Sequence, residues 1–291
     1  ADGKAALSVQ GDGNVTIELD GNNELKSGNL KAGLEKNTSE GTLTLKDDKE
    51  AGSGSLTAEG GGWAAGIGGS DGKGTNNIII SGGTVTAEGG NYGAGIGGGY
   101  GGVGDHITIG GGAVTAEGGE NGAGIGGGYW GRGRNITVSG AAQVTAVAGK
   151  SDEDNFSGFG ATIGDGYNGG DTRDDDGNLI SYGSGKEVQA DISGLTTTGY
   201  IRHMIYNEDG SVKQEWWEYG HLQPDPDGPN APAEESNEVD LGTPLLHVET
   251  LEGDPLPFDA RQQGSTLRVT SDNLAARLHG TRQALEALQE Q

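Results

Sequence analysis

The residues of this sequence best suited to chemistry are aromatic side chains that recur at equal intervals. Each stands four residues before or four residues after an isoleucine, or adjoins such a position. Aromatic rings present apolar faces on which the C–H bonds of a sugar ring can stack. The alternative is that the rings only cover glycine-rich corners of the backbone. The predicted ligand-binding residues are Trp63, Tyr92, Tyr100, Tyr129, Trp130 and Arg132.

A second set of recurring side chains is acidic. Glu59, Glu88 and Glu117 each stand eight residues before the same isoleucines. In stacked strands they would lie about 4.8 Å apart and repel one another. A divalent cation with oxygen ligands, such as calcium, would relieve that repulsion, whereas solvated carboxylates would need no ion. Asp174 and Asp176 lie in a segment that half resembles a calcium-binding loop, and they are further predicted metal ligands.

Catalytic arrangements are harder to find. The regular strands carry no inward cluster of aspartates, and the five histidines show neither Ser-His-Asp nor zinc spacing. Asn77, His106 and Asn135 share one repeat position and are predicted to help stack the strands. No catalytic residue is assigned, so we expect a protein that is not an enzyme. A polysaccharide lyase or hydrolase remains an alternative, because parallel β-helices host such enzymes.

The elements that must position these residues belong to an internal repeat. Within one unit, apolar and polar residues alternate as in strands with one buried face, for example at Thr84-Val85-Thr86-Ala87-Glu88. Three such strands per unit predict an all-β, right-handed parallel β-helix of about 29 residues per coil. A β-propeller is the competing fold, but its blades are usually longer, near 40 residues. Three apolar series keep the 29-residue step: Leu56, Val85, Val114; Ile67, Ile96, Ile125; Ile78, Ile107, Ile136.

Glycines flank each repeated isoleucine and are predicted to face outward, which leaves one side of the solenoid bare. Because a repeated glycine has a conformational cost, something is expected to approach this side closely. The occupant favoured by the sequence is a C-terminal β-hairpin, from Tyr200–Tyr206 through an Asp-Gly turn to Ser211–Tyr219. The glycine pairs are Gly66/Gly68, Gly95/Gly97 and Gly124/Gly126.

The chain divides into three predicted regions. Residues 1–166 form the β-helix, with regular repeats over 55–149. Residues 167–236 hold an acidic loop, the hairpin and a proline-rich linker. Residues 237–291 form a small C-terminal segment that ends in a short helix over Asn273–Gln289, where leucines have helical spacing.

The net charge and the lengths of the apolar runs limit the classes of partner that are expected. The formal net charge of −25 argues against nucleic acid and anionic membrane surfaces. No apolar run approaches the length of a transmembrane helix, so membrane insertion is not expected. The chain contains no cysteine, so its composition does not indicate a redox compartment. It begins Ala1-Asp2-Gly3, as would a mature chain after signal-peptide removal or a chain trimmed at its start. A monomer is expected.

The repeated segment, for instance ISGGTVTAEGGNYGAGIGGG, resembles the Gly-Ile-Gly-Gly repeats of cell-surface proteins from gut Firmicutes. It is also similar to parallel β-helix carbohydrate-binding domains of clostridial surface proteins. The resemblance covers roughly residues 55–166. It implies an extracellular or wall-attached protein of a Gram-positive bacterium that binds an extracellular glycan, such as a host or plant polysaccharide. A structural stalk for a larger surface protein is the main alternative.

Overall fold

The computed structural model describes residues 3–48, 54–150, 159–167, 185–207 and 209–220 with their side chains. The backbones of the short strands at 172–173, 179–181, 239–240, 246–249, 259–263, 266–270 and 277–280 are also described. Two compact units are present, Ala1–Gln223 and Pro224–Gln291. Asp174 and Asp176 lie outside the described residues.

All described secondary structure in the first unit is β-strand. Its strands are β1 (Leu7–Ser8), β2 (Val15–Glu18), β3 (Asn22–Lys26), β4 (Leu34–Glu35), β5 (Leu43–Lys46), β6 (Ser55–Glu59), β7 (Ile67–Gly68), β8 (Thr75–Ile80), β9 (Thr84–Glu88), β10 (Ile96–Gly97), β11 (Gly104–Ile109), β12 (Ala113–Glu117), β13 (Ile125–Gly126), β14 (Gly133–Val138), β15 (Gln143–Val147), β16 (Ile163–Gly164), β17 (Thr172–Arg173), β18 (Leu179–Ser181), β19 (Tyr200–Tyr206) and β20 (Val212–Tyr219).

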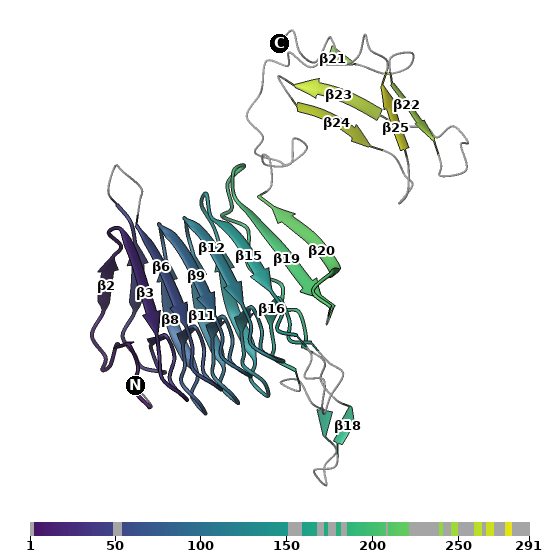
Figure 1. Ribbon diagram of the computed structural model, residues 1–291. Coiled ribbons are helices and arrows are strands. Elements are labelled where there is room, and N and C mark those ends of the chain that lie inside the picture. Colours follow the sequence, from purple (N-terminus) through teal and green to yellow (C-terminus); the bar gives the residue numbers. More distant parts are fainter. Residues whose placement is uncertain are drawn as a thin grey trace. The chain divides into compact units, whose positions relative to one another are not determined.

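Consecutive coils stack as a parallel β-solenoid with three sheets (Figure 1). The first sheet has the order β1-β4-β7-β10-β13-β16, the second β14-β11-β8-β5-β2, and the third β20-β19-β15-β12-β9-β6-β3. In the regular coils each strand pairs with its copy 29 or 30 residues away, so Ile96 lies opposite Ile67 on one side and Ile125 on the other. The predicted β-helix architecture and the predicted isoleucine ladder are therefore confirmed.

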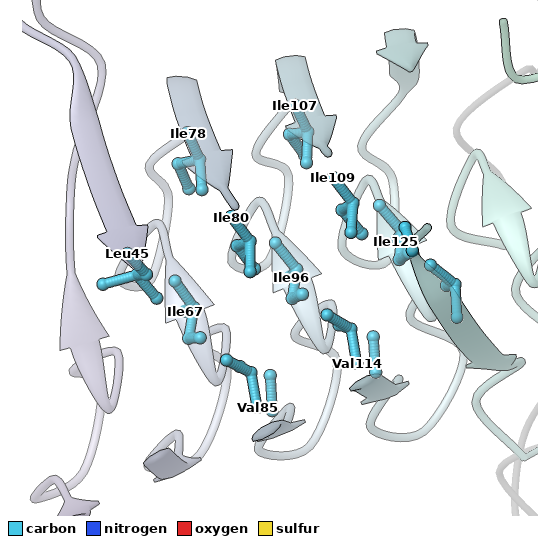
Figure 2. Close-up of a cluster of buried hydrophobic side chains, with 14 of the residues drawn as sticks. Leu45, Ile67, Ile78, Ile80, Val85, Ile96, Ile107, Ile109, Val114 and Ile125 are labelled. Atoms are coloured by element: carbon cyan, nitrogen blue, oxygen red, sulfur yellow. The ribbon is translucent and has the colours of Figure 1, made fainter. Parts of the chain in front are cut away.

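The core is a column of aliphatic side chains between the three sheets (Figure 2). Ile67, Ile96 and Ile125 form its central row, and valines and isoleucines of the other two sheets pack around them. Strands of two to six residues cannot exclude water alone. Because every coil buries its apolar side chains against the next, the column excludes water as a whole.

The glycines beside these isoleucines do not face outward, which corrects the expectation from the sequence. Gly66, Gly95 and Gly124 are buried against the neighbouring coil. A Cβ atom on Gly95 would lie 2.6 Å from the backbone nitrogen of Glu117 and 2.7 Å from the carbonyl oxygen of Gly124. The close approach inferred from the glycines is real, but the approaching group is the backbone of the next coil.

The C-terminal hairpin is formed by β19 and β20 as predicted, but it does not lie on the glycines. Strand β19 pairs in parallel with β15, and β20 pairs antiparallel with β19, so the hairpin extends the third sheet. Free backbone donors and acceptors at the edge of β15 explain this placement, because a new strand satisfies them. The segment from 185 to 195 covers the ends of the other two sheets through bridges at Glu187, Asp191 and Leu195.

A further antiparallel hairpin, β17–β18, lies in the acidic region after the last coil. The second unit contains β21 (Val239–Asp240), β22 (Leu246–Glu249), β23 (Asp259–Gln263), β24 (Thr266–Thr270) and β25 (Arg277–Gly280), and all of their pairings are antiparallel. The helix expected over Asn273–Gln289 is wrong at Arg277–Gly280. These residues pair with Leu246–Glu249 instead, since strand pairing outweighs weak helical propensity around Gly280.

Candidate functional site

Two tight turns flank the short Ile-Gly strand of each coil, and they carry the predicted aromatic residues. In the first turn, the amide of Gly93 donates to the carbonyl of Gly90 at 2.8 Å, and Tyr92 between them has φ +66°. The turn one coil earlier has Trp63 at the same position with φ +67°. A positive φ at only the third residue defines a type II turn, where glycine is the residue without strain.

The second turn repeats this geometry. The amide of Gly131 donates to the carbonyl of Gly128 at 2.6 Å, and Trp130 occupies the third position with φ +66°. The two preceding coils have Gly72 and Gly101 at that position, with φ +66° and +68°. Trp130 therefore stands where the chain elsewhere uses glycine.

The structure brings all five predicted aromatic residues together in one continuous set. Neighbouring ring centroids are separated by 5.4 Å for Trp63–Tyr100, 5.3 Å for Tyr92–Tyr129 and 5.7 Å for Tyr129–Trp130. Backbone bonds join the two turns as well, because the amide of Tyr100 donates to the carbonyl of Trp63 at 2.8 Å. We call this set, together with Tyr167, the aromatic ladder.

Tyr167 was missed in the sequence. Its ring is stacked on that of Tyr129, with centroids 6.1 Å apart and planes 5° apart. Tyr167 stands four residues after Ile163, just as Tyr129 stands four residues after Ile125. The lengthened corner before Ile163 hides this spacing from the 29-residue step, although counting from the isoleucine would have recovered it.

The ladder presents its two tryptophans most openly. Trp63 is 44% exposed and Trp130 39% exposed, whereas Tyr92, Tyr100 and Tyr129 are half-buried. Contacts among the rings occupy much of the tyrosine faces. A ligand would therefore stack mainly on Trp63 and Trp130, with the tyrosines supporting them from below.

Arg132 lies exposed directly before β14, two residues after Trp130. Beyond it, Asp165 is buried and accepts a hydrogen bond from the amide of Gly133 at 2.9 Å. Burial raises the pKa of Asp165, and the backbone bond and the charge of Arg132 oppose that rise.

The predicted glutamate ladder is in register: Glu59, Glu88 and Glu117 are direct partners on β6, β9 and β12. The protein supplies its own cation at one end, where Lys26 Nζ lies 2.5 Å from Glu59 Oε2. At the other end, partial desolvation by its neighbours and then the charge of Glu88 raise the pKa of Glu117, although its side chain is exposed. Lys150 opposes this rise in pKa.

Replacing the central carboxylate should stabilise the solenoid. Glu88→Gln removes the repulsion of Glu88 with both Glu59 and Glu117, so we expect the free energy of unfolding to rise by about 0.2–1 kcal/mol. The gain should shrink at high ionic strength, because salt screens exposed charges. Urea unfolding of both proteins at low and high salt measures it. An unchanged or lower stability at low salt would show that repulsion in the ladder is negligible.

The calcium prediction remains open. Among the residues described with side chains, no three acidic or histidine side chains are grouped so that they could hold a metal ion. The glutamate ladder alone thus forms no metal site, and Asp174 and Asp176 lie outside the described part of the chain. The same unfolding series run with calcium and with EDTA tests the prediction, because a native-state ligand raises stability.

The polar residues at the bend of the second sheet lie outside the strand pairing, but two of them join successive coils through their side chains: Asn77 Nδ2 donates to the carbonyl of Glu40, and Asn135 Nδ2 donates to Asp105. Asn77, His106 and Asn135 have φ of +55°, +50° and +52° and are skipped in the pairing register. Asp105 gathers the neighbouring groups, at 2.9 Å from His106 Nδ1 and 2.8 Å from Asn135 Nδ2. His106 and Asn135 are exposed, and Asp105 between them is half-buried.

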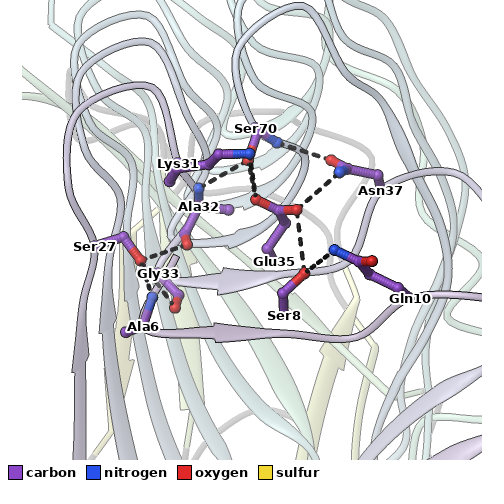
Figure 3. Close-up of polar contacts among 10 residues, drawn as sticks. All are labelled: Ala6, Ser8, Gln10, Ser27, Lys31, Ala32, Gly33, Glu35, Asn37 and Ser70. Carbon is purple, nitrogen blue, oxygen red and sulfur yellow. Dashed lines mark hydrogen bonds and ion pairs between the residues drawn. The ribbon is translucent and has the colours of Figure 1, made fainter. Parts of the chain in front are cut away.

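In a polar cluster near the N-terminus, the buried Glu35 carboxylate is bonded by neighbouring side chains (Figure 3). The Glu35 carboxylate accepts hydrogen bonds from Ser70 Oγ at 2.7 Å, Asn37 Nδ2 at 3.1 Å and Ser8 Oγ at 3.2 Å, and pairs with Lys31 at 3.2 Å. Burial favours a higher pKa for Glu35, but these contacts outweigh it and lower the pKa. Because its partners belong to successive coils, the cluster fastens the irregular first coils together.

Comparison with known proteins agrees with the architecture. The family model described as "Beta helix repeat" matches residues 78–100 and 107–129. These segments run from the second sheet through the third sheet to the aromatic turns of two coils. Comparisons with curated proteins and with solved structures gave no match. In the described residues, no helix is long and apolar enough to cross a membrane.

Proposed function

We propose that this protein is a non-catalytic, glycan-binding adhesion protein, secreted by or displayed on a Gram-positive bacterium. The observation that carries the proposal is the position of Trp63, Tyr92 and Trp130 at positive φ in type II turns. Bulky side chains rarely occupy that conformation, which costs about 1–2 kcal/mol per residue. Glycine at Gly72 and Gly101 shows that the second turn does not require an aromatic residue, and at the first turn Leu30 and Asn121 occupy the equivalent position with φ +64° and +60°.

Backbone strain concentrates at functional positions, and the chemistry of these side chains suggests which function. Stacked rings at the surface suit the C–H faces of sugars. The ladder contains tyrosine phenols but no carboxylate, histidine, serine or cysteine to act with them, which favours binding over catalysis.

The repeat favours a polymeric ligand over a single sugar. Equivalent rings in successive coils present similar contacts in a row, so weak contacts add when one chain spans them. Trp63 and Trp130 lie open at the surface, whereas small molecules usually bind in enclosed pockets. The expected partner is an extended extracellular polysaccharide, bound by a monomer.

Trp130→Gly tests the proposal directly, since it introduces the residue that the preceding coils use. We expect unchanged or slightly higher stability, because strain is relieved, together with roughly tenfold weaker retardation by a glycan that binds the wild type. Affinity electrophoresis against soluble plant, mucin and bacterial polysaccharides measures binding, and urea unfolding measures stability.

The matched control is Gly101→Trp, which places a tryptophan at the equivalent turn one coil earlier. It should lower stability by about 1–2 kcal/mol through the same strain. If Trp130→Gly instead destabilises the protein and glycan retardation is absent in the wild type, the rings act as structural covers. That pair of results would favour the stalk.

A further inference from the structure

A second aromatic cluster lies on the outer face of the third sheet, away from the corner turns. It is formed on the hairpin, where Trp217 is 40% exposed and Tyr219 59% exposed. The adjacent Trp216 points to the opposite face and stacks on the buried His203 at 4.5 Å. One tryptophan of the pair thus serves the packing, and the other is left at the surface.

The exposed rings are held in a defined arrangement. The planes of Trp217 and Tyr219 differ by only 3°, with centroids 6.0 Å apart. Tyr200 packs against Trp217 at 5.1 Å, and the Arg202 guanidinium lies 5.3 Å from the Trp217 ring centroid. Such support fixes the rings before any ligand arrives, which reduces the entropy lost on binding.

Pairing register places this cluster in line with a row of hydroxyl groups. Arg202 lies opposite Thr145 on β15, and Thr115 and Thr86 continue the same row on β12 and β9. These threonines are half-buried, on the face opposite the buried core valines. The row advances about 4.8 Å per strand, so hydroxyl groups and parallel rings share one flat face.

We infer that this face, formed by Tyr200, Arg202, Trp217 and Tyr219 with the Thr86–Thr115–Thr145 row, is a binding surface for a flat, neutral polysaccharide. Rings stack on sugar faces, and threonine hydroxyls both donate to and accept from sugar hydroxyls. The ligand class follows from the proposed function, on which this inference therefore rests. The residues are different, and no residue is shared with the aromatic ladder.

The charges on this face disfavour an anionic ligand, because the Glu59–Glu88–Glu117 ladder lies on the same face, two residues along each strand from the threonine row. Arg202 is already paired with Glu215, with 2.9 Å between Nε and Oε1, so its charge is compensated within the hairpin. A peptide adding to the edge of β20 is less well accommodated. That strand carries Lys213, Glu215 and Glu218, and charged side chains protect sheet edges from strand addition.

The test is sedimentation of the full chain with microcrystalline cellulose and with chitin. We expect the wild type to sediment with at least one of them. Trp217→Ala should weaken binding about tenfold, and Thr86→Val/Thr115→Val several-fold, since valine keeps the strand preference and removes the hydroxyls. Thermal unfolding verifies that each variant is folded.

The double variant Trp130→Gly/Trp217→Ala separates this inference from the proposed function. Trp130→Gly should weaken retardation by soluble glycans, and adding Trp217→Ala to it should still reduce sedimentation about tenfold. Absence of sedimentation with either solid, or equal sedimentation of wild type and Trp217→Ala, would overturn the inference. A wild-type dimer that Trp217→Ala dissociates would also overturn it, since the face would then bind a second copy.

Discussion

Gly95→Ala is expected to destabilise the solenoid by about 3 kcal/mol, at the upper end of the cost of overpacking a core. The new methyl group would lie 2.6 Å and 2.8 Å from the backbone nitrogen and oxygen of Glu117. Those atoms belong to the neighbouring coil and are fixed by sheet hydrogen bonds, so neither can move aside separately. Urea unfolding of purified variants, or the soluble yield if the variant does not fold, measures the effect.

Gly13→Ala is the matched control. No atom lies within 4 Å of the position of its added methyl group, and its φ is not positive. It should change stability by less than about 0.5 kcal/mol, as surface substitutions usually do. Equal stability of Gly95→Ala and Gly13→Ala would show that the coils can separate locally, and that the glycines are not required by packing.

Acidification from pH 6.5 to pH 4 is expected to cost about 3 kcal/mol of stability through His203 alone. Burial lowers the pKa of His203 to about 4. Between about pH 4 and pH 6.5, the imidazole is therefore mostly protonated in the unfolded chain and mostly neutral in the folded protein. The contribution of His203 is fully present above its unfolded pKa of about 6.5 and is lost as pH falls through the folded value.

Burial is the cause of the lowered pKa of His203, and the polar contacts of the ring do not offset it. Its Nδ1 contacts Thr162 Oγ1 at 2.5 Å, and that hydroxyl donates to Glu187 Oε2 at 2.9 Å, so Nδ1 carries the hydrogen. Nε2 is buried without a hydrogen-bond partner among the described residues. Glu218, 3.3 Å from Nε2, is the acidic group placed to favour the charged form.

The measurement compares urea unfolding of wild type and His203→Gln across pH 4–7. The wild-type curve alone is not sufficient, because the raised pKa values of Glu117, Asp165 and Glu187 favour the folded state as pH falls. Both proteins contain these carboxyl groups, so the difference between the two curves isolates the histidine. Parallel stability curves for the two proteins would contradict the prediction. An NMR titration of His203 gives the folded pKa directly.

The fold could be predicted because the repeat constrains it completely. Once Ile67, Ile96 and Ile125 recur every 29 residues, in units whose other strands alternate apolar and polar residues, parallel stacking is the arrangement that buries all of them. The same counting placed the aromatic residues together, since positions that share a register in a solenoid become neighbours in space.

The repeat could not show where side chains point at residues whose backbone is not extended. The sequence does not reveal that Tyr92 occupies a left-handed turn position, or that Gly95 points into the next coil and not into solvent. Both depend on how the two turns fold back beside the short Ile-Gly strand. Period-2 alternation, valid for extended strands, assigned these glycines to the wrong side.

The C-terminal elements were harder for a different reason. The Tyr200–Tyr206 strand was evident from its composition, but its partner was decided by a free sheet edge that no local pattern encodes. At Arg277–Gly280, leucine spacing favoured a helix, whereas pairing with Leu246–Glu249 determined the outcome. Long-range pairing of this kind is invisible to a short sequence window.

The coil-by-coil register has a mechanical consequence. Each coil of about 29 residues is bonded only to the coils before and after it. Tension on one end would load the outermost coil first and leave the interior coils intact. Every coil pulled free would release roughly 100 Å of extended chain while shortening the stack by about 4.8 Å. The solenoid is therefore expected to lengthen under load in successive steps, and each step would dissipate mechanical energy before the remaining coils unfold.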